Sequence, residues 1–156
     1  MLLAIDVGNT QTVFGVYREG LLRHRWRVAT NKHHTSDELR VKLAPLLASE
    51  GIETSDLAGV ALASVVPQLT EAWRTAAVRM TGREALVCSA ETAGALFATG
   101  YPNPREIGAD RVADAVAAKA LYGAPVVVVD FGTATNIEVI DAEGRFAGGV
   151  IAPGGG

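Results

Sequence analysis

The chain has 156 residues, a length that fits one compact domain, and its 49% hydrophobic and 20% charged residues are those of an ordinary globular protein. This composition excludes a disordered chain and a fibrous repeat. The formal net charge of −3 gives no attraction to nucleic acid or to an anionic membrane, so we expect neither as a partner. The only cysteine, Cys88, allows no internal disulfide, and the first residues do not have the pattern of a secretory leader, so we expect a cytoplasmic protein.

The N-terminal part predicts three strands in meander order. Apolar runs at 2–7 and 12–17 are separated by a short polar loop, and a turn at 18–20 precedes a third run at 21–29. Basic residues within that third run alternate with apolar ones, which favours one face of a strand over a phosphate-binding arm. Thr35 and Glu38 then have the spacing of a capping box, which predicts a helix that Pro45 kinks or divides.

From residue 58 onward the pattern predicts alternating strands and helices. Strands are predicted at 58–66 and 84–88, helices at 67–80 and 108–122, a short helix at 91–98 and a Gly- and Pro-rich loop at 97–107. Three strands followed by alternating helices and strands indicate an α/β fold, a mixed sheet flanked by helices.

A segment near the C-terminus repeats the beginning of the chain. An apolar strand at 126–131 runs into Asp130-Phe131-Gly132, as the first strand runs into Asp6-Val7-Gly8. A shift of 124 positions aligns these two motifs and also the Glu-Gly turns at 19–20 and 143–144. We therefore predict a complete domain at 1–123 and the opening strands of a second copy at 124–156, and we expect the second copy to continue beyond Gly156.

Both Asp-x-Gly loops have the composition of a nucleotide phosphate site. Glycine lets the main chain approach an anion, and N–H, hydroxyl and amide groups bind phosphate oxygens. The carboxylate of Asp6 would hold Mg²⁺, directly or through water, because that ion prefers one or two carboxylates plus substrate phosphates. One Asp-x-Gly alone is as compatible with an ordinary β-turn, but two in one register favour the phosphate site. The polar side chains concerned are Asn9, Thr10, Thr12, Thr133 and Thr135.

The start of the helix at 108 is a second candidate site. Asp110 stands where a carboxylate stabilises the positive helix end, and Arg111 has the spacing to pair with Asp114, a structural interpretation that spacing alone favours. The functional alternative places Asp110 beside a substrate hydroxyl and Arg111 on a substrate carboxylate. Tyr101, in the preceding loop, is equally consistent with packing and with a substrate contact. The three histidines and Cys88 lack metal-ligand spacing, and we assign no metal to them.

Five motifs in this order resemble the type III pantothenate kinase family. They lie at residues 6–10, 101–104, 108–111, 130–135 and 148–154 and together span nearly the whole chain. The resemblance implies an actin-like ATPase fold, in which two ribonuclease-H-like domains face each other across a cleft. It also implies ATP-dependent phosphorylation of pantothenate, the first step of coenzyme A biosynthesis, by a cytoplasmic homodimer that uses Mg²⁺ and a monovalent cation, K⁺ or NH₄⁺.

The resemblance also implies roles for individual residues. Asp110 would be the proton acceptor on the pantothenate hydroxyl, Asp130 the ligand of the monovalent cation and Thr133 a second nucleotide contact. The implied first phosphate loop consists of Asp6, Val7, Gly8, Asn9, Thr10, Gln11, Thr12 and Val13, and the implied pantothenate pocket of Tyr101, Gly108, Ala109, Asp110 and Arg111.

One position departs from the family pattern. Asn136 stands where a further threonine is common, which keeps a polar side chain but loses the hydroxyl. The strands from Val126 onward are expected to expose an apolar face unless helices from elsewhere cover it. Two alternatives remain open: a non-catalytic relative of the same fold that acts as a regulatory or interaction module, and another small-molecule kinase or ATPase of that fold.

Overall fold

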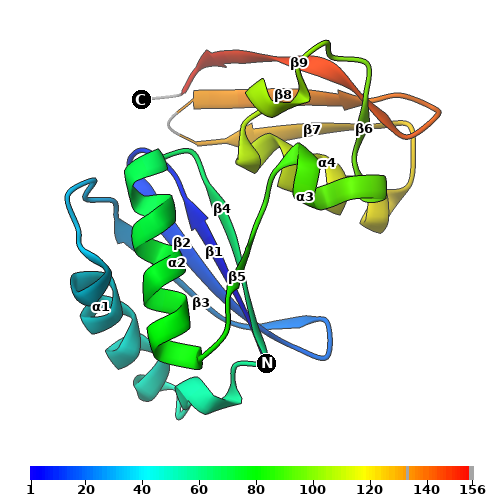
Figure 1. The fold of residues 1–156 in the computed structure, drawn as a ribbon. Helices are drawn as coiled ribbons and strands as arrows, with labels where there is room; N and C mark the ends of the chain where they lie inside the picture. The colour runs from blue at the N-terminus through cyan, green and yellow to red at the C-terminus, as the bar shows by residue number, and fades with distance from the viewer. Residues whose placement is uncertain (133, 155–156) are drawn as a thin grey trace. The chain divides into compact units, whose positions relative to one another are not determined.

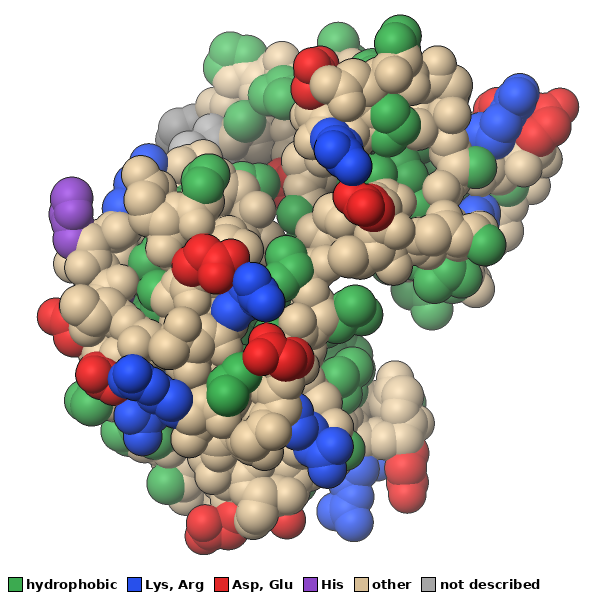
Figure 2. Space-filling view, in the orientation of Figure 1, with side chains coloured by type: hydrophobic (Ala, Val, Ile, Leu, Met, Phe, Trp, Pro, Cys, Tyr) green, Lys and Arg blue, Asp and Glu red, His purple; other side chains and the backbone are tan. Residues whose placement is uncertain are grey.

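The computed structural model of the chain describes residues 1–132 and 134–154. Its contacts divide the chain into two compact units, Met1–Val87 and Cys88–Gly156, and each unit has its own sheet (Figure 1). No helix among the described residues is long and apolar enough to cross a membrane. Figure 2 shows acidic and basic side chains interspersed on the visible face of each unit.

The first unit is a five-stranded mixed sheet. The strands β1, β2 and β3 form an antiparallel meander, and β4 and β5 add to it in parallel, in the order β3-β2-β1-β4-β5. The predicted meander is therefore confirmed. The strand bounds are β1 Leu2–Val7, β2 Gln11–Arg18, β3 Leu21–Ala29, β4 Gly59–Ser64 and β5 Ala85–Val87.

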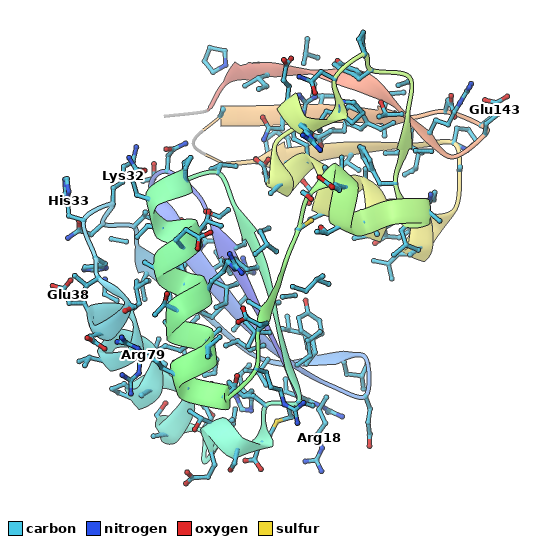
Figure 3. The ribbon with its side chains drawn as sticks, in the orientation of Figure 1. Arg18, Lys32, His33, Glu38, Arg79 and Glu143 are labelled. Carbon is cyan, nitrogen blue, oxygen red and sulfur yellow. The ribbon has the colours of Figure 1, made fainter. Side chains whose placement is uncertain are left out.

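Two helices, α1 (Ser36–Ser49) and α2 (Pro67–Thr81), and a short 3₁₀ turn, η1 (Thr54–Asp56), complete the first unit. The predicted capping box at the start of α1 is confirmed: the hydroxyl of Thr35 accepts from the main-chain N–H of Glu38 at 3.3 Å, and the Glu38 carboxylate accepts from the N–H of Thr35 at 2.8 Å. The hydrogen bonds that the Glu38 carboxylate accepts from the N–H and the hydroxyl of Thr35 lower the pKa of Glu38. Figure 3 shows Arg79 of α2 next to α1, where it donates to Asp37 at 2.8 Å.

Pro45 lies inside α1 and does not divide the helix, so the predicted division was wrong. A proline removes one helical hydrogen bond and leaves the carbonyl four residues earlier without its donor. That carbonyl belongs to Val41, on the solvent side of the helix, where the residue is 74% exposed. Leu43 and Leu47, on either side of the proline, are both buried, and their packing against the core keeps both sides of the proline helical.

The core of the first unit lies between one face of the sheet and the two helices. Leu3, Ile5 and Val7 of β1 face it and are at most 2% exposed. Phe14 of β2 also faces the core and meets the ring of Trp73 of α2 edge to face. Because strand residues alternate between faces, Asp6 lies on the opposite face of the sheet, where it is exposed.

The second unit has a four-stranded sheet in the order β6-β9-β8-β7, in which β7, β8 and β9 form an antiparallel meander and β6 pairs with β9 in parallel. The strand bounds are β6 Ala98–Thr99, β7 Val126–Phe131, β8 Ala134–Ile140 and β9 Arg145–Pro153. The helices are α3 Ala90–Ala93 and α4 Ala109–Tyr122, and the 3₁₀ turns are η2 Gly94–Leu96 and η3 Pro104–Glu106.

The segment 97–107, predicted to be a loop, contains the strand β6 and the turn η3, and the short helix predicted at 91–98 is α3 followed by η2. The prediction of a continuous loop was therefore wrong. β6 forms because Thr99 pairs with Phe146 of β9 and donates its hydroxyl to the Phe146 carbonyl at 3.0 Å. These partners lie 47 residues apart, so no local pattern could indicate the strand.

The helix α4 packs on β7 and β8 and belongs to the second unit. Its buried Val112 and Ala115 share a second core with Ile140 and Phe146 of the sheet. The sequence prediction placed the domain boundary between residues 123 and 124 and so assigned α4 to the first domain, whereas the contacts group α4 with β7 and β8. The division into compact units therefore falls earlier, after Val87.

The meander of β7, β8 and β9 repeats that of β1, β2 and β3, which agrees with the predicted duplication. In the first hairpin Val7 pairs with Thr12, whereas in the second Phe131 pairs with Thr135, so the second loop is one residue shorter. The shift of 124 positions holds along β7 and becomes 123 positions along β8.

The two meanders are covered on opposite faces. The positions of β7 that correspond to the core residues of β1 are Val127, Val129 and Phe131, which are 58%, 46% and 83% exposed. The alternate residues Val126 and Val128 pack against the core around α4. The expected exposed apolar face is confirmed, and Asp130 lies on the face of the sheet that α4 covers.

This difference in coverage predicts unequal costs for truncating side chains at corresponding positions. Ile5→Ala removes a side chain that is 2% exposed, and we expect it to lower the free energy of unfolding by about 2–5 kcal/mol. Val129→Ala, at a position that is 46% exposed, should cost no more than about 1 kcal/mol. Urea denaturation followed by circular dichroism measures both, and equal losses would contradict the assignment of faces.

Candidate functional site

The loop between β1 and β2 is a tight turn that favours glycine at position 8. The main-chain N–H of Gly8 donates to the Gln11 carbonyl at 2.9 Å. A Cβ at Gly8 would lie 3.0 Å from that same oxygen, closer than side chains normally approach. The following Asn9, Thr10 and Gln11 are exposed. An apolar strand therefore ends in an exposed polar turn, which is the arrangement that the composition of the loop predicted.

Residues of this loop differ in what their side chains can reach. Thr12 is 3% exposed, and its hydroxyl lies 2.9 Å from the hydroxyl of Thr30 in the interior of the unit. The main-chain N–H of Thr30 also donates to the Thr10 carbonyl at 2.9 Å, so the end of β3 supports the loop. The buried side chain of Val7 packs in the core, and Val13 is half-buried, so their main-chain groups are what they offer a ligand.

The loop between β7 and β8 is built differently. The N–H of Gly132 donates to the Ala134 carbonyl at 3.0 Å, and a Cβ at Gly132 would make an ordinary 3.5 Å contact with that oxygen. The predicted nucleotide contact Thr133 lies outside the described residues. Thr135 and Asn136 are half-buried on β8. Asn136 pairs with Asp130 in the register, so the position that departs from the family pattern shares a face with that aspartate.

Asp110 and Arg111 stand in the first turn of α4, directly after Gly108 and Ala109. The Asp110 carboxylate accepts from the main-chain N–H of Arg111 at 2.8 Å. The side chain of Arg111 crosses to the sheet, where its Nε donates to the carboxylate of Glu138 at 3.1 Å. Helix and sheet are thus joined by an ion pair at the residue next to Asp110.

Sequence reasoning missed Glu138, which is fully buried on β8 beneath α4. Burial raises the pKa of this carboxyl, the hydrogen bond and charge of Arg111 oppose that rise, and the negative charges of Asp110 and Asp130 add to it. The charges of Arg111, Asp110 and Asp130, all in the same unit, thus act on this one buried carboxyl. Along β8, polar residues at 136 and 138 alternate with apolar residues at 137 and 139, a pattern that predicts an exposed side chain at Glu138. In the structure this side chain is buried instead.

The guanidinium of Arg111 is enclosed by residues of β9. Its central carbon lies 5.3 Å from the centre of the Phe146 ring, over the ring face. A Cβ at Gly149 would lie 2.5 Å from Nη2 of Arg111, and a Cβ at Gly148 would lie 3.2 Å from the hydroxyl of Tyr101. The two glycines therefore leave the space that Arg111 and Tyr101 occupy, and the structure brings these two predicted pocket residues to one strand.

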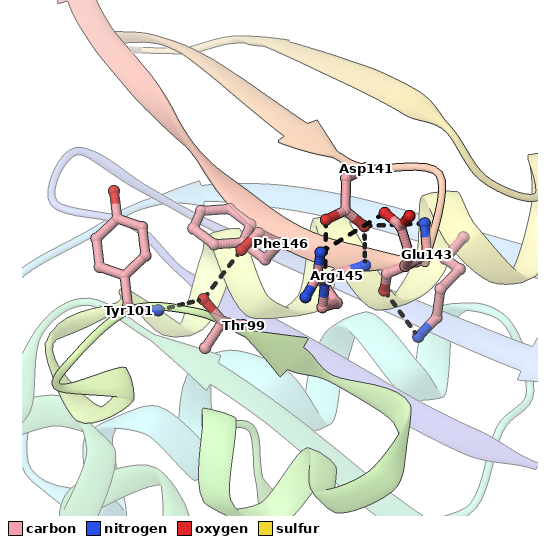
Figure 4. A network of polar contacts seen from close by, with 8 residues as sticks. Thr99, Tyr101, Asp141, Glu143, Arg145 and Phe146 are labelled. Atoms are coloured by element: carbon pink, nitrogen blue, oxygen red, sulfur yellow. Dashed lines mark hydrogen bonds and ion pairs between the residues drawn. The ribbon is translucent and has the colours of Figure 1, made fainter.

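A cavity of about 430 Å³ opens beside Tyr101, at the end of the β8–β9 hairpin. Figure 4 shows how Thr99 fixes its edge: the Thr99 hydroxyl accepts from the Tyr101 N–H at 3.1 Å and donates to the Phe146 carbonyl. On the other side Arg145 donates to Asp141 at 3.0 Å, and hydrogen bonds from the main chain and side chain of Arg145 lower the pKa of Asp141.

The predicted site residues thus fall into two sets. Residues 6–13 belong to the first unit, and the second unit holds Tyr101, Gly108, Ala109, Asp110, Arg111 and Asp130. Among residues 1–132 and 134–154, no group of three or more His, Cys, Asp or Glu side chains is placed to hold a metal ion by itself. Any ion at Asp6 or Asp130 would need oxygens from the main chain or from a substrate in addition.

Comparison with known proteins gives one family over nearly the whole chain. The family model described as "Type III pantothenate kinase" matches residues 2–156. The type III pantothenate kinase of Moorella thermoacetica is 44% identical over 158 residues, which cover 99% of this chain and 60% of the relative. That of Anaeromyxobacter sp. strain K is 47% identical, with the same coverage. The chain therefore spans about 60% of the length of the curated relatives it matches.

Solved structures with low sequence identity share the fold. The ethanolamine utilization protein EutJ from Carboxydothermus hydrogenoformans has a TM-score of 0.55 at 22% identity, covering 99% of this chain and 52% of that one. A putative 2-dehydro-3-deoxygalactonokinase from Sinorhizobium meliloti has a TM-score of 0.56 at 17% identity, covering 97% and 53%. With the sheet order, these confirm the predicted fold class, a ribonuclease-H-like mixed sheet that is duplicated, with the second copy incomplete.

The position of Gly149 predicts a steric effect on the site. In Gly149→Ala the new Cβ would meet both Nη2 of Arg111 and the carbonyl oxygen of Ile137. We expect a loss of about 1–3 kcal/mol in the free energy of unfolding, as for other overpacked positions. Gly132→Ala, where a Cβ has 3.5 Å of space, is the matched control and should cost less. Thermal and urea unfolding measure both, and an unperturbed Gly149→Ala protein would contradict the described packing.

The thiol of Cys88 should report the charge of Asp110. Its Sγ donates to the Ala109 carbonyl at 3.5 Å, and burial raises the pKa of the thiol, with a further rise from the negative charge of Asp110. Asp110→Asn removes that charge and should lower the pKa of Cys88, so alkylation by iodoacetamide should begin at a lower pH. The rate is measured against pH by mass spectrometry. The exposed Glu91→Gln is the control, and identical profiles for all three proteins would contradict the proximity of the two groups.

Proposed function

The chain belongs to the type III pantothenate kinase family, and we propose that the protein transfers the terminal phosphate of ATP to the hydroxyl of pantothenate. The product is 4'-phosphopantothenate, and the reaction is the first step of coenzyme A biosynthesis. The observation that carries this proposal is the placement of Asp110 and Arg111, a carboxylate and a guanidinium, in the first turn of α4, in the same compact unit as Tyr101 and Asp130. A kinase for a substrate with one hydroxyl to phosphorylate and one carboxylate to recognise needs this pair of groups.

Asp110 is proposed as the group that receives the proton of the pantothenate hydroxyl. Its carboxylate is held by the N–H of Arg111 at 2.8 Å, which fixes one oxygen. A loose phosphoryl-transfer transition state depends on an oriented nucleophile more than on early proton removal. A carboxylate fixed at a helix start supplies that orientation.

Arg111 is proposed to bind the carboxylate of pantothenate, and Tyr101, Gly108 and Ala109 to complete the pocket. A guanidinium matches the planar geometry of a carboxylate better than any other cationic side chain. The arrangement of Tyr101 and Arg111 over the two glycines of β9 supports this role, since both side chains are placed by the same strand.

The nucleotide is proposed to bind at the exposed turn after β1, with residues 6–13 as the first phosphate loop and Thr133 as a second contact. Asp6 would hold Mg²⁺, directly or through water, and Asp130 the monovalent cation, K⁺ or NH₄⁺. Both are exposed carboxylates, the oxygen ligands that hard cations prefer. When bound with ATP, Mg²⁺ neutralises charge on the phosphate oxygens.

We extend the proposal to the assembly and compartment that the family resemblance implies, a homodimer in the cytoplasm. The single cysteine and the mixed, weakly negative surface charge are compatible with that compartment. The chain spans about 60% of the length of its curated relatives. The activity, substrates and assembly proposed here are therefore those of the complete gene product.

The decisive variant is Asp110→Asn in the complete gene product. We expect ATP-dependent formation of 4'-phosphopantothenate to fall at least about 100-fold in kcat, the usual contribution of a general acid or base. Glu91→Gln, an exposed carboxylate of the same unit that pairs with Arg105 at 3.4 Å, is the control and should retain full activity.

Normal turnover by Asp110→Asn would overturn the role of Asp110. Calorimetry of the wild type with pantothenate and a non-hydrolysable ATP analogue tests the family activity separately. A protein that binds neither ligand would be a non-catalytic relative, and one that phosphorylates a different hydroxyl compound in a substrate panel would be another small-molecule kinase of this fold.

A further inference from the structure

The contact between Arg111 and Glu138 leaves one buried polar atom of each side chain without a hydrogen-bond partner among the described residues. Glu138 is fully buried, and the Arg111 side chain is 16% exposed. Only Nε of Arg111 and Oε1 of Glu138 meet, while Nη2 of Arg111 and Oε2 of Glu138 are buried without a hydrogen-bond partner among the described residues. Each buried polar atom left in this way lowers stability, and the two charges together carry a large desolvation penalty.

A pair built for stability alone would have another geometry. Arginine and carboxylate groups pair most strongly through two parallel hydrogen bonds, which would satisfy both carboxylate oxygens. Here the carboxylate holds the guanidinium by the Nε edge alone. This contact sets where the planar group lies and leaves its terminal nitrogens outside the pair.

Three separate elements restrict the guanidinium. Glu138 of β8 holds Nε, the ring of Phe146 of β9 lies under the plane with its centre 5.3 Å from the central carbon, and the absence of a side chain at Gly149 leaves room for Nη2. The register places Glu138 directly opposite Gly149, so the carboxylate and the space come from one pair of residues on neighbouring strands.

We propose that Glu138 is a positioning residue of the substrate site, which fixes the Arg111 guanidinium in the orientation that receives the carboxylate of pantothenate. This rests on the function proposed above. Glu138 acts through Arg111 and does not itself touch the reacting atoms. It also keeps Arg111 away from a competing partner: the carboxylate of Asp110 belongs to the adjacent residue, and a guanidinium released from Glu138 could turn to it and occupy the group needed by the substrate hydroxyl.

Charge supports this assignment. The carboxylate of Glu138 holds the guanidinium at 3.1 Å, and the negative charges of Asp110 and Asp130 act on that same carboxylate. An anionic substrate can approach such a site only along the direction in which the cation is presented. A guanidinium held in one orientation by Glu138 therefore presents its positive charge to the substrate in a fixed direction.

The test replaces Glu138 in the complete gene product and compares two substrates. Glu138→Met keeps the volume but removes the acceptor, and Glu138→Gln keeps an acceptor for Nε without the charge. We expect the KM for pantothenate to rise about tenfold or more in Glu138→Met, the effect of losing a charge-assisted hydrogen bond, and less in Glu138→Gln. The KM for ATP should change much less, because the proposed first phosphate loop, residues 6–13, belongs to the other unit.

A second substrate separates positioning from a merely structural role. The alcohol analogue of pantothenate, with CH₂OH in place of the carboxylate, has no anion for Arg111 to bind. The wild type should prefer pantothenate over this analogue in kcat/KM, and Glu138→Met should lose most of that preference. Glu143→Gln, an exposed glutamate of the β8–β9 hairpin, is the matched control and should keep the wild-type preference.

Two results would overturn the inference while leaving the proposed function intact. One is a Glu138→Met protein that keeps the wild-type preference for pantothenate, and the other is an equal rise in KM for pantothenate, its alcohol analogue and ATP. Should Glu138→Met fail to fold by circular dichroism, Glu138→Gln decides by the same comparison. A wild type that neither binds nor phosphorylates pantothenate would instead overturn the proposed function, and this inference with it.

Discussion

The buried contact between Arg111 and Glu138 is the constraint on which the second unit depends. It joins the first turn of α4 to the middle of β8, and so sets where Asp110, the neighbouring residue, stands relative to the sheet. Two charges in an apolar interior are tolerated only when they pair, and this pair is supported further by the Phe146 ring. Removing either member would leave a lone buried charge next to the candidate site.

The same strand meander is used twice with different faces turned inward. In the first unit α1 and α2 cover Leu3, Ile5 and Val7, and Asp6 is left on the open face. In the second unit α4 covers the alternate face, which carries Asp130 and Glu138. Corresponding aspartates therefore have different surroundings, and a role for one does not transfer to the other by the repeat alone.

Much of the fold could be predicted because local sequence patterns specify most of its strands and helices. Alternating apolar runs predict the strands, and the Thr35 to Glu38 spacing predicts the start of α1. Features that depend on distant partners could not be predicted: Pro45 stays helical because leucines on both sides pack against the core, and Thr99 joins a strand because Phe146 lies beside it. In the candidate site, Asp110 and Arg111 could be named from their motif, whereas Glu138 lay in a strand whose polar residues pointed, by pattern, to solvent.

The sequence by itself determined which residues alternate along each strand, that the opening meander recurs near the C-terminus and which family the motifs resemble. It did not determine which of the two faces of a strand is covered, because a period of two separates the faces without saying which one meets a helix. Only the tertiary structure decided that, by packing α4 on the face that carries Glu138 and leaving Val127, Val129 and Phe131 exposed. Burial then turned an ordinary strand glutamate into the partner that holds Arg111.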